Sequence, residues 1–160
     1  MRRAPRLRQL VAALAVAASM LAAGCSTDAP RNSAGEVTAS ADSDAFALKV
    51  GDCTGALGTG SIDQVALVPC TEPHDYEAYA SMRLTQDTFP GTDQVTEQAD
   101  AFCAREFKNF VGIDYEESKY QISSLMPTKE SWSSAGDREV LCLAGKDSGK
   151  ITGSLKGVRK

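Results

Sequence analysis

The chain has few of the residues that build catalytic and metal sites. Its 160 residues include one histidine, one tryptophan and five cysteines. No Cys-x-x-Cys pair and no second histidine offer the ligand spacing of a zinc site. The Gly-x-Ser-x-Gly motif of many serine hydrolases is also absent. We therefore expect no metal, no cofactor and no catalytic residue, and the sequence indicates a protein that is not an enzyme.

The N-terminal apolar run is too short to cross a membrane. Residues 10–23 form an apolar segment of about 14 residues, against the roughly 20 that a spanning helix needs. Four arginines precede it, as is typical of a secretory signal. The segment ends in a motif that resembles the bacterial lipobox, Leu21-Ala22-Ala23-Gly24-Cys25. We expect residues 1–24 to be a lipoprotein signal peptide and Cys25 to carry diacylglycerol and palmitate; the alternative is an ordinary signal peptide with an incidental cysteine.

Basic residues are outnumbered once such a signal is removed. The remaining chain has 13 basic and 21 acidic residues, a net charge of −8. A chain this acidic is repelled by phosphate backbones, which argues against nucleic-acid binding. The expected location is the outer face of the cell membrane, reached through the lipid anchor. The expected partner is an envelope or division protein, or a wall polymer.

Aromatic residues are missing from the segment after the signal. Residues 25–44 consist of Cys25 followed mainly by Ser, Thr, Ala, Asp and Asn. Such a segment buries too little apolar surface to offset its conformational entropy. The sequence therefore predicts a flexible tether over residues 25–44 and an extracytoplasmic domain over residues 45–160.

Four cysteines remain in that domain, an even number that suits an oxidising compartment. They allow three pairings, and the sequence alone does not choose between them. We prefer Cys53–Cys70 with Cys103–Cys142, because the second bond would clamp a predicted helix to a predicted central strand.

Short apolar patterns predict an antiparallel sheet. Strands are expected at residues 46–50, 65–68, 74–84, 119–126 and 139–144, with a weak edge strand within 151–158. Strict alternation over residues 74–84 would place Tyr76, Ala78 and Ala80 on one face and Glu77 and Tyr79 on the other.

One helix interrupts the strands. Apolar residues at steps of three and four over residues 92–112 predict an amphipathic helix of about 18 residues, with Cys103 facing inward. Thr92 or Asp93 is the expected N-cap, and Gly112 the C-terminal stop. The fold class is α+β: a small, disulfide-stapled antiparallel sheet with one packed amphipathic helix.

Two polar pairs are candidate contacts for a ligand or partner. His74-Asp75 could act as an acid–base pair, but catalysis would also need a nucleophile and an oxyanion site. A structural corner is the favoured interpretation, with Asp75 accepting backbone hydrogen bonds or pairing with Arg138. Arg138 is also expected to meet a carboxylate, and its nearness to Trp132 allows a surface for peptide or glycan recognition.

The order of these motifs resembles the septum-formation domain family of exported or membrane-anchored actinobacterial proteins. The resemblance covers about residues 48–157 and rests on Gly51-Asp52-Cys53, Val68-Pro69-Cys70-x-x-Pro73-His74-Asp75, Cys103 and Trp132-x-x-x-Gly136-Asp137-Arg138-x-x-x-Cys142. It implies a role in septation or envelope growth and brings no catalytic residue with it. A non-catalytic binding module is the favoured function. The alternatives are a hydrolase that acts on the cell wall and a small-ligand-binding lipoprotein.

Overall fold

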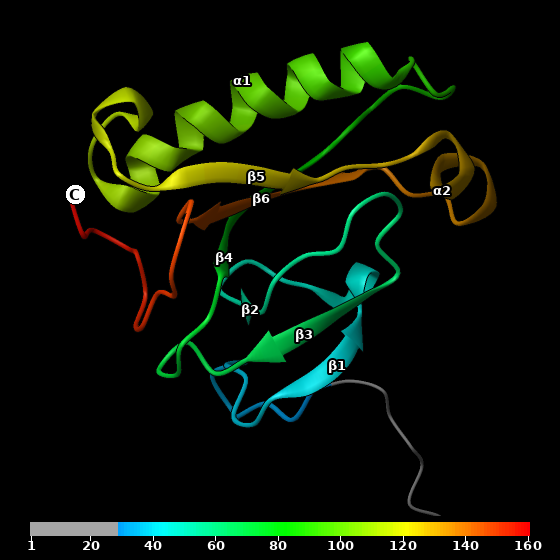
Figure 1. Cartoon of the computed structure of the whole chain (residues 1–160). Coiled ribbons are helices and arrows are strands. Elements are labelled where there is room, and N and C mark those ends of the chain that lie inside the picture. Colours follow the sequence, from blue (N-terminus) through cyan, green and yellow to red (C-terminus); the bar gives the residue numbers. More distant parts are fainter. Residues whose placement is uncertain (1–28) are drawn as a thin grey trace, which may run out of the picture.

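A six-stranded antiparallel sheet with a long helix on one face dominates the computed structural model, which describes residues 29–160 (Figure 1). The strand order is β1-β3-β2-β4-β6-β5. The strands are β1 (Ala41–Asp44), β2 (Cys53–Thr54), β3 (Gln64–Val68), β4 (Tyr76–Arg83), β5 (Gln121–Leu125) and β6 (Glu139–Gly145). This architecture confirms the predicted α+β class.

The long helix α1 (Thr92–Val111) carries the expected apolar stripe. Its buried residues are Val95, Ala99, Cys103, Phe107 and Val111. The helix ends at Gly112, whose φ of 93° is left-handed and whose N–H donates to the Lys108 carbonyl. The predicted side-chain cap is wrong: Gly91 is the N-cap, because Thr92 and Asp93 already lie in the first helical turn. Within residues 29–160, no helix combines the length and apolar character needed to cross a bilayer.

Strand β6 separates two hydrophobic clusters. Val140, Cys142 and Ala144 belong to the cluster that α1 covers, and Leu141 and Leu143 belong to the cluster on the opposite face. Because successive side chains of a strand point to opposite faces, a nearly continuous apolar run is what a strand buried on both sides requires. Its predicted central position is therefore correct.

Strand β4 contains a bulge that the sequence pattern did not indicate. Ala78 pairs with Leu143 and Ala80 with Cys142, so Tyr79 is an extra residue in the ladder. As a result Tyr79 and Ala80 both contact the cluster under α1, while Ala78 lies in the other cluster. The predicted strict alternation is correct through Tyr79 and wrong from Ala80 onward.

Two predicted strands are absent from the described residues. Residues 45–47 form the 3-10 helix η1 (Ala45–Ala47), because the Asp44 carboxylate accepts the Phe46 N–H and turns the chain. Residues 151–158 contribute only the bridge between Ile151 and His74. Beyond it the chain turns at Gly153, whose φ is 81°.

The prediction of a flexible tether through residue 44 is wrong from residue 29 onward. Ala29 and Val37 are buried in the cluster away from α1. β1 pairs with β3 over four residues, from Ala41 opposite Leu67 to Asp44 opposite Gln64. Ala29 and Val37 thus pack into the domain, and β3 provides the hydrogen-bonding partners for the backbone of β1. The proposed signal peptide, Cys25 and the rest of residues 25–28 lie outside the described part of the chain.

Both disulfides have the preferred pairing. Cys53 is bonded to Cys70, 17 residues later, and Cys103 to Cys142, 39 residues later. The second bond joins α1 to β6 at the centre of the fold. Two short helices complete the structure, η2 (Tyr115–Glu117) and α2 (Lys129–Ser134).

Candidate functional site

A groove of about 700 Å³ opens at the end of β5. Leu48, Leu125 and Leu141 line it and pack in the cluster on the sheet face away from α1. Its walls come from η1, from the loop at residues 60–63 and from the chain that runs from β5 into α2. The floor is therefore apolar and made by segments far apart in the sequence.

The wall after β5 is set by a helix cap. The Thr128 hydroxyl accepts the Ser131 N–H at 3.0 Å, and the Ser131 hydroxyl accepts the Thr128 N–H at 2.9 Å. This reciprocal pair is a capping box, which fixes the direction in which a helix begins. It starts α2 directly after Pro127 and so places the helix along the rim of the groove.

One large apolar side chain at the rim is open to solvent. Phe46 is 58% exposed and lines the groove from η1. The Asp44 cap that forms η1 presents Phe46 outward. Val50, at 53%, is the other exposed large apolar side chain within residues 29–160, and it does not line the groove.

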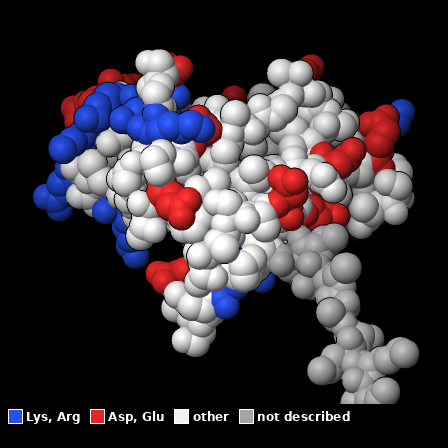
Figure 2. All heavy atoms as spheres, turned by 60° about the horizontal axis from the view of Figure 1, so that its bottom comes forward, with Lys and Arg blue, Asp and Glu red and all other residues white. Residues whose placement is uncertain are grey.

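Acidic side chains surround this apolar floor. Among residues 29–160, the groove is lined by Asp63, Glu130, Asp137 and Glu139 but by a single basic residue, Lys129. Figure 2 shows the wider pattern: most visible Lys and Arg side chains gather on the left, where the C-terminus lies in Figure 1, and several Asp and Glu side chains lie toward α2. A negative rim over an apolar floor suits a ligand that combines an apolar group with a positive charge.

Two of the rim carboxylates have structural partners and two are open. Asp137 accepts the Ser131 hydroxyl at 2.9 Å and the Glu139 N–H at 3.0 Å, and Glu139 accepts the Ser81 hydroxyl. The side chains of Asp63 and Glu130 make no hydrogen bond or ion pair among residues 29–160. They are the carboxylates available to a ligand.

His74 and Asp75 form a corner and not an open site. His74 is fully buried, and its Nδ1 donates to the Glu72 carbonyl at 2.8 Å. Its backbone exchanges two hydrogen bonds with Ile151. Asp75 forms an ion pair with Lys150, so the predicted pairing with Arg138 is wrong. The reason is the Ile151 bridge, which brings the preceding Lys150 beside Asp75.

Trp132 and Arg138 brace α2 against β6. The Arg138 guanidinium lies 3.6 Å from the centre of the Trp132 ring. It also donates to the Trp132 carbonyl at 3.0 Å and to the Asp137 carbonyl at 2.7 Å. The expected carboxylate partner of Arg138 is thus replaced by a ring and backbone carbonyls. The Trp132 side chain itself is 4% exposed and packs on Phe89.

The fold does not bring the two predicted pairs together. His74 precedes the start of β4, whereas the Arg138 carbonyl accepts the N–H of Leu84, just after its end. None of His74, Asp75, Trp132 and Arg138 lines the groove. Sequence reasoning also missed the groove residue Phe46, because its alternation with Leu48 was interpreted as a strand.

One cluster has the residue types of a metal site but another use. Ligand atoms of Cys53, Cys70 and Glu77 lie within 4.8 Å of one another. The two sulfur atoms are bonded to each other, and the Glu77 carboxylate accepts the Ser154 hydroxyl and the Leu155 N–H, both at 2.6 Å. This buried carboxylate therefore fastens the C-terminal segment to β4.

Comparison with known proteins identifies the family. The septum formation family model matches residues 20–142 and 89–156. Uncharacterized membrane proteins of Mycobacterium tuberculosis strains CDC 1551 and H37Rv are each 27% identical over 104 residues. The match covers 58% of this chain and only 22% of either relative. No solved structure matches. Neither the family description nor the relatives' names point to catalysis, and the chain belongs to the septum formation family.

Proposed function

We propose that the protein is a lipid-anchored, non-catalytic binding module of the cell envelope that acts in septation or envelope growth. Family membership supports the link to septation, and the relatives' description as membrane proteins supports a place at the membrane. Two disulfides suit an exported domain, and the lipobox-like motif that ends in Cys25 supports a lipid anchor at that residue.

The groove is the observation that carries the binding role. It places an exposed Phe46 beside a floor that includes Leu125 and Leu141, under a rim with the open carboxylates of Asp63 and Glu130. The matching partner is a segment of an envelope protein in which an apolar side chain lies next to lysine or arginine. The apolar side chain would gain burial on the floor, and the basic group would meet the rim.

The edge of the sheet adds a second means of recognition. In the described part of the chain, β5 is the last strand of the sheet and pairs with β6 alone. Its outer edge can accept backbone hydrogen bonds from an extended segment, as in strand addition. Because Ser124 and Leu125 of β5 also line the groove, such a segment could use the edge and the groove together.

A small-ligand-binding lipoprotein is the second candidate. The groove volume of about 700 Å³ falls within the roughly 300–1,000 Å³ of small-molecule pockets. A small cationic ligand would be expected to keep its affinity when the outer edge of β5 is blocked, whereas a strand-adding segment would not.

The test compares the two exposed apolar residues. A photo-crosslinking amino acid at position 46 should capture a discrete envelope partner in intact cells, and the same residue at position 50 should not. Phe46→Ala should lose complementation of a deletion strain while its melting temperature and surface abundance stay at the Val50→Ala level. Equal crosslinking at the two positions, or full complementation by Phe46→Ala, would contradict a binding role for the groove.

The chemistry of the partner has a separate test. Two extended peptides that share an apolar residue, one with flanking lysines and one with flanking glutamates, are titrated into the isotope-labelled protein. The lysine peptide should shift the amide signals of Leu125, Ser131 and Glu130, and Glu130→Gln should weaken the effect. A preference for the glutamate peptide would contradict the assignment.

A further inference from the structure

The N-terminal segment of the domain is fastened to the sheet close to residue 29. The Ala29 side chain is 5% exposed and lies in the cluster away from α1. Arg31 and Val37 form an antiparallel bridge, and the Thr38 N–H donates to the Pro30 carbonyl at 2.9 Å. Residues 30–38 therefore form a tight loop that begins and ends on the domain.

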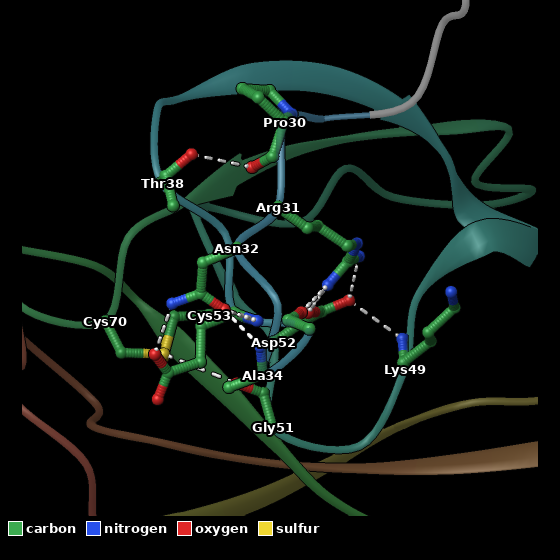
Figure 3. A network of polar contacts seen from close by, with 12 residues as sticks. Pro30, Arg31, Asn32, Ala34, Thr38, Lys49, Gly51, Asp52, Cys53 and Cys70 are labelled. Carbon is green, nitrogen blue, oxygen red and sulfur yellow. Dashed lines mark hydrogen bonds and ion pairs between the residues drawn. A yellow bond between two sulfur atoms is a disulfide. The ribbon is translucent and has the colours of Figure 1, made fainter.

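An ion pair locks this loop (Figure 3). Arg31 Nη1 lies 2.5 Å from Asp52 Oδ1, and Nη2 lies 2.8 Å from Oδ2. Asp52 is 3% exposed and also accepts the Lys49 N–H at 2.9 Å. Within the loop, the Asn32 side chain accepts the N–H groups of Ala34 and Glu36. A two-pronged pair with a buried carboxylate is costly to open, because opening it leaves a charge without its partner.

Only residues 26–28 separate Cys25 from Ala29, the first buried residue of this segment. A fully extended chain advances at most about 3.6 Å per residue, so Cys25 and Ala29 can be no more than about 14 Å apart. A lipid on Cys25 would sit in the outer leaflet of the membrane. The domain would then have no long tether by which to leave the bilayer.

We propose that the domain docks on the outer leaflet of its own membrane through the face that carries residues 30–38. This inference rests on the proposed lipid anchor at Cys25. The loop of residues 30–38 lies on the lower side in Figure 1, and α1 lies across the sheet at the top. The docked domain thus turns α1 away from the lipid, and partners of the groove must reach it at the membrane surface.

Two exposed alanines on opposite sides of the domain allow a matched test. Ala34 lies at the tip of the loop and Ala104 on the outer side of α1, and both are exposed. The mature, lipidated protein with Ala34→Cys or Ala104→Cys is labelled with a fluorophore and placed in phosphatidylglycerol–phosphatidylcholine vesicles. Some of the lipids carry a nitroxide on the headgroup, which quenches fluorophores only at close range.

The label at position 34 should be quenched several-fold more strongly than the label at position 104. Insertion of twenty Gly and Ser residues after Asp28 should remove most of this difference while the lipid stays in place. Equal and weak quenching at both positions in protein that carries the lipid would overturn the docking inference and leave the anchor standing. Intact-mass analysis without a diacylglycerol would overturn the anchor, and the docking inference with it.

Discussion

Arg31 and Asp52 form a two-pronged ion pair across 21 residues of sequence, with exposures of 18% and 3%. The pair ties the first described residues to the turn before β2. It thereby converts a polar, aromatic-free segment into part of the domain. Removal of this pair should therefore lower the stability of the whole domain.

Arg31→Ala should lower the free energy of unfolding by about 3 kcal/mol, near the low end for breaking a buried pair. The value is at the low end because Asp52 keeps its hydrogen bond from Lys49. Arg105→Ala is the control: its pair with Glu106 lies at the surface, and its loss should cost under about 1 kcal/mol. Urea denaturation measures both variants. Equal losses of unfolding free energy in Arg31→Ala and Arg105→Ala would show that the Arg31–Asp52 pair does not hold the N-terminal segment on the domain.

The two disulfides should differ in their contributions. Replacement of Cys103 and Cys142 by alanine opens a link across 39 residues and should cost about 4 kcal/mol, against about 3 kcal/mol for Cys53 and Cys70, which are 17 residues apart. Guanidinium denaturation measures both losses. Peptide mapping without reduction should recover these two links, and a Cys53–Cys142 link would contradict the architecture.

Tyr79→Phe should change how stability depends on pH. The Tyr79 hydroxyl donates to the Cys103 carbonyl at 2.7 Å, and its loss should cost about 1 kcal/mol near pH 8. Burial, and then the nearby Glu106 carboxylate, raise the pKa of Tyr79 in the folded state. The folded protein therefore keeps this proton when the unfolded chain, with a tyrosine pKa of about 10, releases it.

The stabilising effect of that proton is complete below about pH 10 and declines at higher pH. Above pH 10, the unfolding free energy of the wild type should thus fall more steeply than that of Tyr79→Phe. The difference in unfolding free energy between the two proteins should therefore become smaller as the pH rises. Urea denaturation between pH 8 and pH 11 measures it. A constant gap would mean that Tyr79 ionises alike in both states.

His74→Ala should act through stability. The side chain is fully buried, so its removal loses the hydrogen bond to the Glu72 carbonyl and leaves a cavity, at a cost of about 2–3 kcal/mol. Asp75→Asn is the control, since its pair with Lys150 is partly exposed and should contribute under about 1 kcal/mol. Complementation of a deletion strain by His74→Ala should decrease in proportion to the loss of folded protein. Wild-type melting with complete loss of function in His74→Ala would point instead to a ligand or catalytic role.

Local patterns in the sequence predicted most of the regular elements. The apolar stripe of α1 and the continuous apolar run of β6 are periodicities of single segments, and the sequence displays them directly. The even cysteine count, with one cysteine on the helix and one on the central strand, indicated a clamp that the structure contains. The motif order around Cys53, Cys70 and Cys142 indicated the family.

What the sequence missed depends on contacts between distant residues. The bulge at Tyr79 exists because β4 must fit the register of β6, and Asp75 meets Lys150 because Ile151 bridges to His74. The composition of residues 29–44 indicated a segment too polar to fold. In the structure, Asp52 pairs with Arg31 and β3 pairs with β1, and composition alone does not reveal such partners from elsewhere in the chain.

The groove is the clearest case. Phe46, Ile62, Leu125 and Glu130 come from four segments, and no spacing within any one of them indicates a shared site. The sequence by itself determined the helix α1, the central strand β6, the even number of cysteines and the family. Only the tertiary structure decided the groove and the packing of residues 29–44, because both are made by side chains that meet when the sheet folds.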